Sequence, residues 1–428
     1  MFTSFSTALS ALDATSTAID VVGNNLANMN STGFKESDMS FSNLVTQSLG
    51  AGLGSTQVGF GTATPLTVTN FSQGAIQTTP DGLLNGAIAG QGFFMVQDPN
   101  TGNTEYTRAG DFQTDENGNL MTANGDYVQG WTANVNGQID TNAAVSKIVV
   151  PVGTLQAPIA TANVTTSLNL DSAAAAGTNF SDTVTIYDSL GTSHQLTFTF
   201  TAQSPNNWNY TASIPAADTA DDGVSGDNVV ATGSLVFNPD GSLDGADCSP
   251  TPPVTLTMPL LADAAAWNPN AATPDTIIWS LINANGASTI TQYDQPSASS
   301  SSNQDGQAAS QLVNVGLGDG GAILAQYSDG QQVTVAQVAL ASIVNPDSLV
   351  AVGNNNYMLS AKSAAPNIGI PNTGGRGQIQ GASLESSNVD IATEFTNLIV
   401  YQRGYEANGK VVSTANQLSQ DTINLIAG

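Results

Sequence analysis

Apolar residues recur in three- and four-residue steps at both ends of the chain, and this spacing predicts two amphipathic helices in heptad register. The N-terminal stripe is Phe2, Phe5, Leu9, Leu12, Ile19 and Leu26, with Ser16 and Gly23 at its two non-apolar positions. The C-terminal stripe runs through Ile391, Phe395, Leu398, Gln402, Tyr405, Gly409, Val412, Asn416, Ser419, Ile423 and Ile426. An isolated helix gains most of its stability by burying one face. We therefore expect the chain to leave along one helix and return along the other, as an antiparallel stem.

The helix pattern of the N-terminus holds from about Phe2 to Met29 and stops at a turn-forming cluster that ends in Gly33. Residues 34–75 show little periodicity and many Gly, Ser and Thr residues, which is typical of an extended connector arm. The C-terminal helix is expected to begin near Ser386. Residues 1–33 and 384–428 are thus predicted to form the helical stem.

Residues 76–383 carry the two-residue alternation of strands, separated by turns rich in Asn, Asp and Gly. The strand pattern of residues 76–150 resumes in residues 311–383, so we expect these stretches to form one discontinuous β-rich domain. A second strand series, residues 151–310, predicts an inserted outer β-rich domain, which the serine run from Ser297 to Ser302 closes. The predicted fold class is mainly β with terminal α-helices.

The net charge of the chain limits the kinds of molecule that it is expected to bind. Lys and Arg number 7 against 34 Asp and Glu, a net charge of -27, which opposes binding to nucleic acid or to an anionic membrane surface. Only 10% of residues are charged, so uncharged polar residues and Gly must cover the surface. This composition is typical of an extracellular face.

Cysteine and histidine occur once each. Cys248 alone excludes an internal disulfide, and His194 alone excludes the usual zinc sites built from several His and Cys ligands. No Lys or Arg precedes Lys35 and no apolar core follows the first residues, so we expect no cleaved secretory signal. No stretch approaches the ~18 apolar residues of a membrane-spanning helix. Export would then use a route without signal cleavage.

Three segments resemble ligand-binding loops. Asp115-Glu116-Asn117-Gly118 and the run from Asp240 to Asp244 carry alternating oxygen ligands, but neither continues to the distal Glu of a calcium-binding EF-hand. The run from Gly316 to Gly321 leads into strand pattern, whereas a dinucleotide-binding loop leads into a helix. We interpret all three as turns.

His194 lies inside a strand pattern, with Asp188 and Ser193 nearby in the sequence. Proximity in sequence does not identify a catalytic triad. The many aspartates make carboxylate pairs unavoidable, so a glycosidase is a weak alternative. We predict that the chain is not an enzyme and that it has no catalytic, cofactor or metal site.

The helical stripes contain residues that weaken an isolated helix. Gly23, Gly404 and Gly409 each cost about 1 kcal/mol relative to Ala in a helix interior. Gln402 and Asn416 also interrupt the apolar stripe. The stem should therefore be marginal alone and ordered when neighbouring copies cover it, which favours polymerisation over a self-sufficient stem.

Both ends also carry long, spaced motifs. The N-terminal motif comprises Phe5 to Leu12, then Asn24, Asn25, Leu26, Ala27 and Asn28, then Thr32, Gly33, Phe34 and Lys35. The C-terminal motif comprises Leu384 to Asn388, Val389 and Asp390, then Glu394, Phe395, Leu398 and Ile399, then Gln402, Arg403, Tyr405, Ala407, Asn408 and Lys410. These motifs resemble the terminal signatures of the flagellar rod and hook axial proteins.

Internal segments extend the resemblance over nearly the whole chain, most weakly between about 215 and 310. Segments such as Tyr106 to Phe112 are shared with rod proteins, whereas Asp188-Ser189-Leu190-Gly191 and Val352-Gly353-Asn354-Asn355 resemble hook segments. Rod proteins mostly lack an inserted domain like residues 151–310. Within the family, the likeness to hook subunits is thus the closer one.

The resemblance implies a structural subunit that passes unfolded through the flagellar export apparatus and polymerises into the flexible, curved hook of the flagellum. Its implied partners are copies of itself, the rod, the hook cap, the hook–filament junction proteins and the export apparatus. The implied location is the hook and basal body, extracellular after export. Two alternatives stay open: a distal-rod axial subunit and a secreted β-rich adhesin or carbohydrate-active protein.

Overall fold

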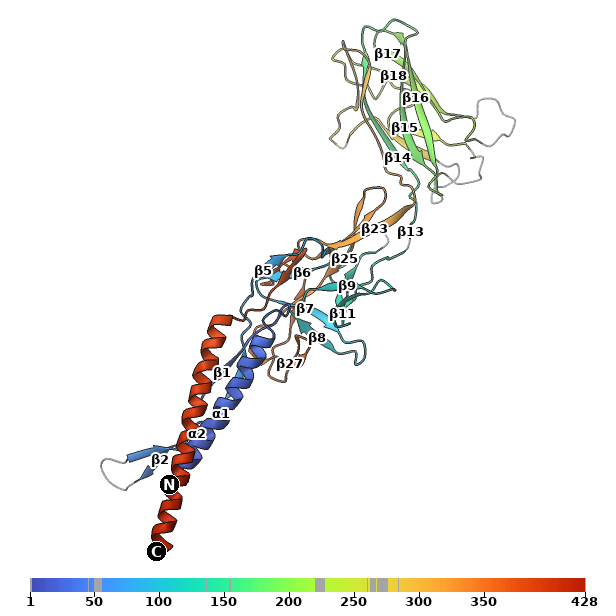
Figure 1. Ribbon diagram of the computed structural model, residues 1–428. Coiled ribbons are helices and arrows are strands. Elements are labelled where there is room, and N and C mark those ends of the chain that lie inside the picture. The colour runs from blue at the N-terminus through green and yellow to red at the C-terminus, as the bar shows by residue number, and fades with distance from the viewer. Residues whose placement is uncertain are drawn as a thin grey trace. The chain divides into compact units, whose positions relative to one another are not determined.

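The computed structural model describes residues 2–44, 46–49, 56–134, 137–153, 155–219, 228–259, 261, 267, 276–283 and 285–427; the side chains of residues 2–4, 46–49, 56–58 and 425–427 are not described. The chain divides into two compact units. Unit 1 comprises Met1–Val152, Val313–Gln326 and Gln331–Gly428, and unit 2 comprises Gly153–Leu312 and Tyr327–Gly330. The chain is mainly β with one helix at each end, which confirms the predicted fold class (Figure 1).

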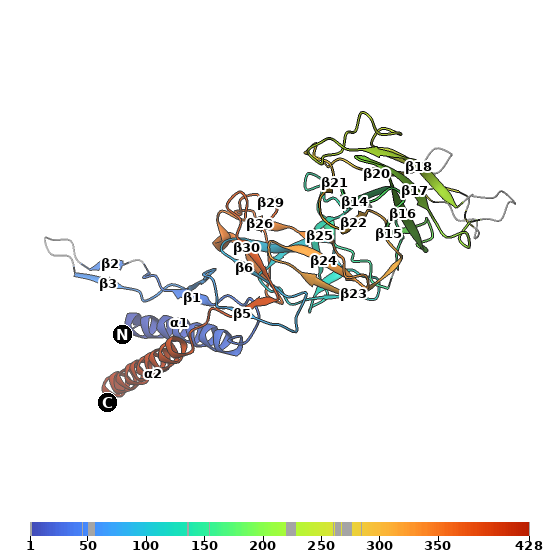
Figure 2. The ribbon, with the colours of Figure 1, turned by 90° about the horizontal axis from the view of Figure 1, so that it is seen from above.

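The two terminal helices of unit 1 are α1, Phe2–Ala27, and α2, Ile391–Ala427. They lie side by side and antiparallel (Figures 1 and 2). The helix α2 starts at Ile391 rather than near Ser386, so that expectation is wrong. The carboxylate of Asp390 caps it by accepting the backbone N–H groups of Ala392 at 2.8 Å and Thr393 at 3.0 Å.

The connector contains short antiparallel strand pairs. β1, Ser37–Ser40, pairs with β4, Leu66–Thr69, and β2, Thr46–Leu49, pairs with β3, Thr56–Gly59. β5, Ile76–Thr78, then pairs with β31, Ser383–Glu385, directly before α2. This last pair joins the segment after the connector to the segment before α2. The region where residues 33–38, 70–76 and 383–390 meet is called the base of the stem below.

The β part of unit 1 is built on a sheet whose strands pair antiparallel in the order β24-β25-β11-β7-β8-β28-β27. In chain order the strands of this region are β6 Gly86–Ala89, β7 Phe93–Gln97, β8 Thr104–Thr107, β9 Phe112–Thr114, β10 Leu120–Thr122, β11 Tyr127–Thr132, β12 Ser146–Lys147, β23 Ser310–Leu317, β24 Ala322–Tyr327, β25 Gln332–Val338, β26 Leu340–Ser342, β27 Val350–Gly353, β28 Asn356–Met358, β29 Asn367–Gly369 and β30 Gln378–Gly381. A short 3-10 helix spans Pro346–Ser348.

Strand β7 shows why this sheet is stable. Its side chains alternate between two faces, and four successive residues are buried. Phe94 and Val96 join one core cluster, and Phe93 and Met95 join another on the opposite face. Both faces of β7 are therefore covered, which makes this strand the centre of the unit.

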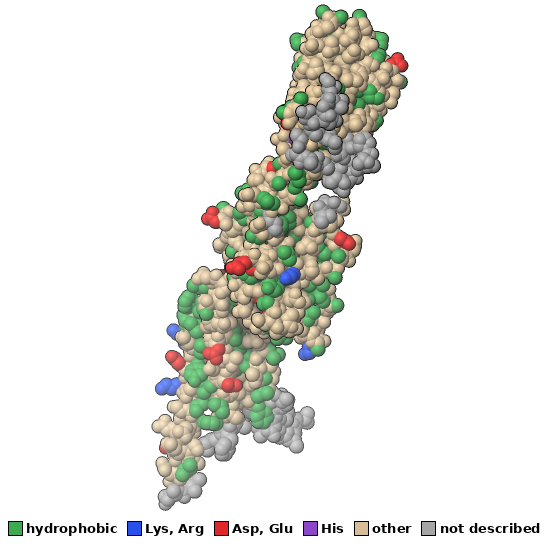
Figure 3. Space-filling view, turned by 90° about the vertical axis from the view of Figure 1, so that its right-hand side faces the viewer, with side chains coloured by type: hydrophobic (Ala, Val, Ile, Leu, Met, Phe, Trp, Pro, Cys, Tyr) green, Lys and Arg blue, Asp and Glu red, His purple; other side chains and the backbone are tan. Residues whose placement is uncertain are grey.

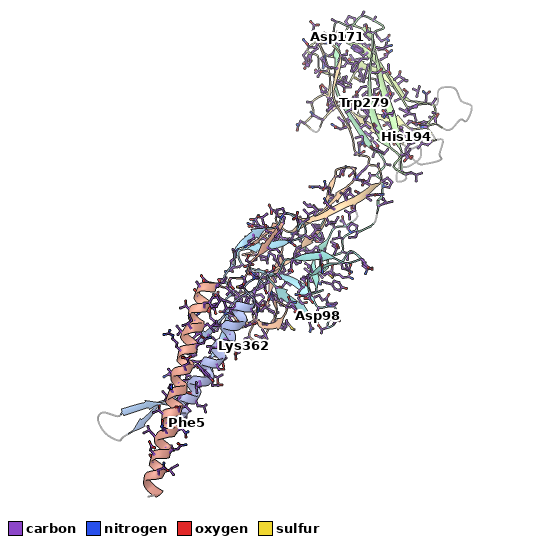
Figure 4. The ribbon with its side chains drawn as sticks, in the orientation of Figure 1. Phe5, Asp98, Asp171, His194, Trp279 and Lys362 are labelled. Carbon is purple, nitrogen blue, oxygen red and sulfur yellow. The ribbon has the colours of Figure 1, made fainter. Side chains whose placement is uncertain are left out.

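Unit 2 is a sandwich of two sheets. One sheet has the antiparallel order β15-β16-β17-β18, and the other has β19-β20-β14-β21 with β22 also paired to β14. The strands are β13 Leu155–Gln156, β14 Asn163–Asp171, β15 Asn179–Tyr187, β16 Ser193–Ser204, β17 Asn207–Ser213, β18 Val229–Val236, β19 Val254–Thr257, β20 Thr276–Ser280, β21 Ile290–Tyr293 and β22 Ala298–Gln304. Trp279 stacks on Phe198 of the facing sheet, with ring centroids 4.4 Å apart (Figure 4).

The serine run does not simply close this unit. Ser299 to Ser302 lie in β22 and pair antiparallel with β14. Serine has little intrinsic preference for strands. However, without β22 the backbone groups along this edge of β14 would be left unpaired. Tertiary pairing therefore overrides local propensity here.

Candidate assembly surface

The helix α1 buries a face of small residues. Ala8, Ala14, Ala18 and Val22 are at most 4% exposed. On the same side, Thr15 lies against α2, because a Cβ placed on Gly404 would be 3.7 Å from the Thr15 side chain. Small side chains allow the axes of two helices to come close together. The buried side of α1 thus carries small residues, whereas several large residues of the predicted stripe stay exposed in one chain.

The large residues of the predicted stripe whose side chains the structure describes are partly buried or exposed in one chain. Six of their large side chains are between 42% and 61% exposed: Phe5, Leu9, Ile391, Phe395, Tyr405 and Ile423. Five others are partly buried: Leu12, Ile19, Leu26, Leu398 and Val412. The side chains of Phe2 and Ile426 fall outside the described residues. Phe5 lies on α1 towards the free end of the stem (Figure 4), and hydrophobic side chains gather along the stem surface (Figure 3).

Most of the surface of helix α2 is exposed in one chain. Among the described side chains from residue 391 to 424, only that of Glu394 is buried. Beyond the predicted stripe, α2 also exposes Ile399, Val400, Val411 and Leu418, each by 46% to 58%. Exposed apolar side chains in such number on one helix indicate a site of contact with another molecule.

A buried ion triad fixes the base of the stem. The carboxylate of Glu385 in β31 lies 2.6 Å from the Lys35 ammonium and 3.2 Å from the Arg108 guanidinium. It also accepts the backbone N–H of Gly74 at 2.9 Å. Burial lowers the pKa of Lys35 and of Arg108, and the Glu385 carboxylate opposes this shift in both. One carboxylate therefore holds the connector, the β part and the segment before α2 together.

Gly33 makes the turn after α1 fit against the β part. Its φ is 66°, and a Cβ there would sit 2.5 Å from the backbone nitrogen of Ala109. Its N–H donates to the carbonyl of Glu385 at 2.8 Å. Only glycine combines this backbone conformation with so close an approach.

Two asparagines of the terminal motifs act as bridges between backbone segments. Asn25 is 1% exposed, and its amide donates to the Ser37 carbonyl and accepts the Ser37 N–H, both at 3.0 Å. Asn388 accepts the N–H of Glu36 at 2.8 Å and donates to the carbonyl of Asn70 at 2.9 Å. Each amide satisfies a donor and an acceptor that would otherwise be unpaired at the base of the stem.

Four carboxylates gather near these bridges: Glu36, Asp38, Asp390 and Glu394. Burial raises the pKa of Glu394, against the effect of nearby Asn25 and Asn397 amides, and Asp38 raises it further. Burial also raises the pKa of Glu36. The base of the stem thus favours the neutral form of these two acids.

The other motif residues are placed as follows. Asn28 donates to the Asn24 carbonyl at 2.9 Å, Asn355 donates to the Thr32 carbonyl at 3.0 Å, and Phe34 is buried. Asn408 donates to the Gly404 carbonyl at 2.9 Å, Val389 is partly buried, and Ala27, Gln402, Arg403 and Ala407 are exposed on the helices. The motifs therefore divide into residues that build the base of the stem and residues that stay free on its surface.

Sequence reasoning missed the triad and the buried Glu394. Glu385 and Lys35 are 350 positions apart, so no local pattern joins them. The sequence did hold one usable signal: because the chain has only 7 Lys and Arg residues, each of them is expected to have a specific structural role.

The three loops with ligand-like sequences are turns. Asp115 accepts the backbone N–H groups of Asn117 and Asn119, and Asp240 accepts that of Ser242. The glycines after β23 lead into β24. Within the part of the chain that the structure describes, no three His, Cys, Asp or Glu side chains gather as a metal site requires.

His194 lies buried in β16 (Figure 4). Its Nδ1 is 3.0 Å from a carboxylate oxygen of Asp218, its Nε2 is 3.6 Å from one of Asp188, and its ring lies 4.8 Å from that of Trp267. Asp188 is fully buried and accepts the backbone N–H groups of Leu190 and Thr192. The histidine is thus part of the packing around a hairpin turn.

Family comparisons cover most of the chain. Residues 5–35 match the flagella basal body rod protein family, and residues 87–165 match the D1 domain of flagellar hook proteins FlgE/F/G. Residues 154–307 match the flagellar basal body protein FlaE D2 domain, and residues 380–425 match the C-terminal region of basal body rod FlgEFG proteins. No helix among the described residues is both long and apolar enough to cross a membrane.

Whole-chain relatives agree with these matches. The flagellar hook protein FlgE of Borreliella burgdorferi is 31% identical over 453 residues, covering 99% of this chain and 100% of the relative. That of Salmonella typhimurium is 30% identical over 439 residues, covering 99% and 100%. A crystal structure of Helicobacter pylori flagellar hook protein FlgE2 aligns with a TM-score of 0.52 at 13% identity, covering 71% of this chain and 99% of that one, and supports the fold. The chain belongs to the flagellar hook protein family and is a structural component of the bacterial flagellum.

Proposed function

We propose that this chain polymerises with copies of itself into a flexible curved tube that transmits torque from the rod to the filament, and that it has no enzymatic activity. The observation that carries this proposal is the exposed helix α2: among its described side chains in one chain, that of Glu394 is buried and all the others are partly buried or exposed. A helix with so little covered surface needs neighbours to be stable.

The exposed apolar side chains supply the driving force for such contacts. Fully burying a Leu, Ile or Phe side chain contributes about 1.5–3 kcal/mol. Phe395, Ile399, Val400, Leu418 and Ile423 are each more than half exposed. Their coverage in a polymer offsets the helix cost of Gly404 and Gly409, about 1 kcal/mol each.

We propose a division of labour along the chain. Residues 1–33 and 384–428 form the inner tube, and residues 34–75 link each subunit to its neighbours. Residues 76–150 with 311–383 form the middle domain, and residues 151–310 form the outer domain. Outer surfaces that are polar and weakly charged make wet, easily exchanged contacts, so they can slide while the inner tube stays intact. Such a tube bends while it transmits torque, as a universal joint does.

The remaining partners follow from membership of the family. We propose that the ends of the tube contact the rod on one side and the hook–filament junction proteins on the other. A hook cap and the flagellar export apparatus act during assembly. The net charge of -27 gives the subunit no attraction for nucleic acid or for an anionic membrane.

Electron microscopy of the concentrated full-length chain tests this function. We expect curved tubes. Straight, stiff tubes would instead indicate a distal-rod subunit, and the absence of tubes together with binding to carbohydrate would indicate an adhesive or carbohydrate-active protein. Removal of residues 1–33 and 384–428 should abolish the tubes, whereas an adhesin or enzyme would keep its activity.

A further inference from the structure

Exposed side chains of opposite charge lie on the two helices of the stem. Helix α1 has two acidic residues, Asp13 and Asp20, and no basic residue. Helix α2 has two basic residues, Arg403 and Lys410, with Glu406 between them, and its other acidic residues, Glu394 and Asp421, lie outside this stretch. Both pairs are seven positions apart, and all four side chains are exposed. Seven residues are close to two helical turns, so each pair lies on one side of its helix, about 10 Å apart.

The two pairs point away from each other within one chain. Thr15 and Gly404 mark where α1 and α2 meet. At 3.6 residues per turn, Asp13 and Asp20 lie on the side of α1 opposite its buried alanines, and Arg403 and Lys410 lie on the side of α2 away from Gly404. In agreement, no ion pair joins them among the residues that the structure describes.

Complementary patches on opposite sides of one molecule form a head-to-tail contact, which builds rings or helical polymers rather than closed dimers. On the basis of the proposed function, we infer that Asp13 and Asp20 of one subunit pair with Lys410 and Arg403 of a second copy of this chain. A neighbour placed alongside in the same orientation presents its α1 antiparallel to this α2. In that arrangement Asp20 meets Arg403 and Asp13 meets Lys410.

Both pairs require the same displacement along the stem. Within one chain, Thr15 lies level with Gly404, so Asp20 is level with residue 399 and Asp13 with residue 406. Each acid must move by about four residues to meet its cation, which is an axial shift of ~6 Å. The agreement between the two pairs means that one lattice translation satisfies both of them.

The surface between the charges is suited to close approach. A shallow hollow of about 640 Å³ on α2 is lined by Arg403, Glu406, Ala407, Gly409, Lys410 and Ser413. In the same register, Ser16 of the neighbour's α1 comes level with Ala407. Small residues then face each other between two ion pairs, which allows the charged groups to reach one another. Glu406 lies between the two cations in the sequence, so its carboxylate reduces the net positive charge of this surface to one.

Charge reversal in the full-length chain tests the pairing. We expect Asp20→Arg or Arg403→Glu alone to raise the critical concentration for tube formation at least tenfold. The double variant should return it to within about threefold of wild type, because every interface of the homopolymer then carries the swapped pair. Two exposed positions outside the helices, Glu116→Lys and Lys362→Glu, give matched changes of charge and should leave assembly unchanged.

Two outcomes separate this inference from the proposed function. If wild type forms no tubes, the proposed function fails. If wild type forms tubes and both single reversals assemble as it does, or if the double variant is no better than either single one, only the pairing is overturned. A second measurement uses cysteines at positions 20 and 403, since native Cys248 is buried. Oxidised tubes of the double-cysteine chain should give a ladder of covalent oligomers that neither single cysteine gives, and the absence of the ladder would contradict the pairing.

Discussion

The role of the buried ion triad is tested by removing the negative charge of Glu385. In Glu385→Gln, the shape of the side chain is kept, but the Lys35 ammonium and the Arg108 guanidinium lose their shared counter-ion. The Lys35 and Glu385 side chains are both 0% exposed, and their charged atoms are 2.6 Å apart. Breaking a buried ion pair by removing one partner costs about 3–5 kcal/mol. The amide oxygen of Gln still accepts one hydrogen bond, so we expect about 3 kcal/mol.

The loss of stability in Glu385→Gln should depend on pH in a defined direction. Burial already lowers the pKa of Lys35, and Glu385 is the largest influence that opposes this. Without the carboxylate, the folded-state pKa falls further below that of the unfolded chain. The unfolded state then binds more protons than the folded state, so stability rises with pH across this window. The destabilisation by Glu385→Gln should therefore become smaller as the pH is raised from neutral towards the pKa of free lysine.

Hydrogen exchange measured by mass spectrometry on the monomer is the suitable assay, because a chain with two units has no single unfolding midpoint. Peptides that cover residues 30–36 and 383–389 should exchange faster in Glu385→Gln by the factor that corresponds to ~3 kcal/mol, a little over 100-fold. Unit 2 should not change. The exposed Glu116→Gln serves as a control. Unchanged exchange at the base of the stem would refute the role given to the triad.

Three further predictions concern assembly and pH. Leu9→Asp should abolish tubes in electron microscopy while leaving both units folded, because Leu9 is 54% exposed. The control Leu190→Asp, at a turn residue that is 65% exposed, should assemble normally. Tubes from Leu9→Asp would show that the stripe is not an assembly surface. Burial raises the pKa of Glu394, so the stability that its neutral form gives is present at low pH and is lost as the pH rises through this raised value. Glu394→Gln should accordingly protect residues 391–400 from exchange more than wild type does at pH 7, and equally at about pH 4; weaker protection at pH 7 would contradict this. Finally, the net charge of -27 should make tube growth, followed by light scattering, faster in high salt or at mildly acidic pH, and equal rates at low and high ionic strength would count against long-range repulsion between subunits.

Local patterns predicted much of the fold. The three- and four-residue spacing located α1 and α2, and the two-residue alternation located most strands. Turn chemistry was equally informative: Asp188, read as part of a turn, accepts two backbone N–H groups of that turn. These features depend on residues close together in the sequence, which is why they could be read from it.

Features that depend on distant residues could not be read in the same way. The serines of β22 form a strand only because β14 lies beside them. The buried side of α1 carries alanines, whose weak hydrophobicity is hidden by the stronger signal of Phe5, Leu9 and Leu12. Lys35 and Arg108 meet Glu385 only after the chain has returned to the base of the stem. The features that the sequence analysis missed thus depend on contacts between residues far apart in the chain, and weak local propensity was not the cause.

The central claim is that α2 is incompletely covered in one chain and is completed by copies of that chain. The most direct measurement compares hydrogen exchange of residues 391–424 in dilute monomer and in assembled tubes. We predict rapid exchange in the monomer, strongest beyond the part of α2 that faces α1, and slow exchange along the whole helix in the tube. Equal, slow exchange in both states would show that the helix is already stable alone and would contradict the account.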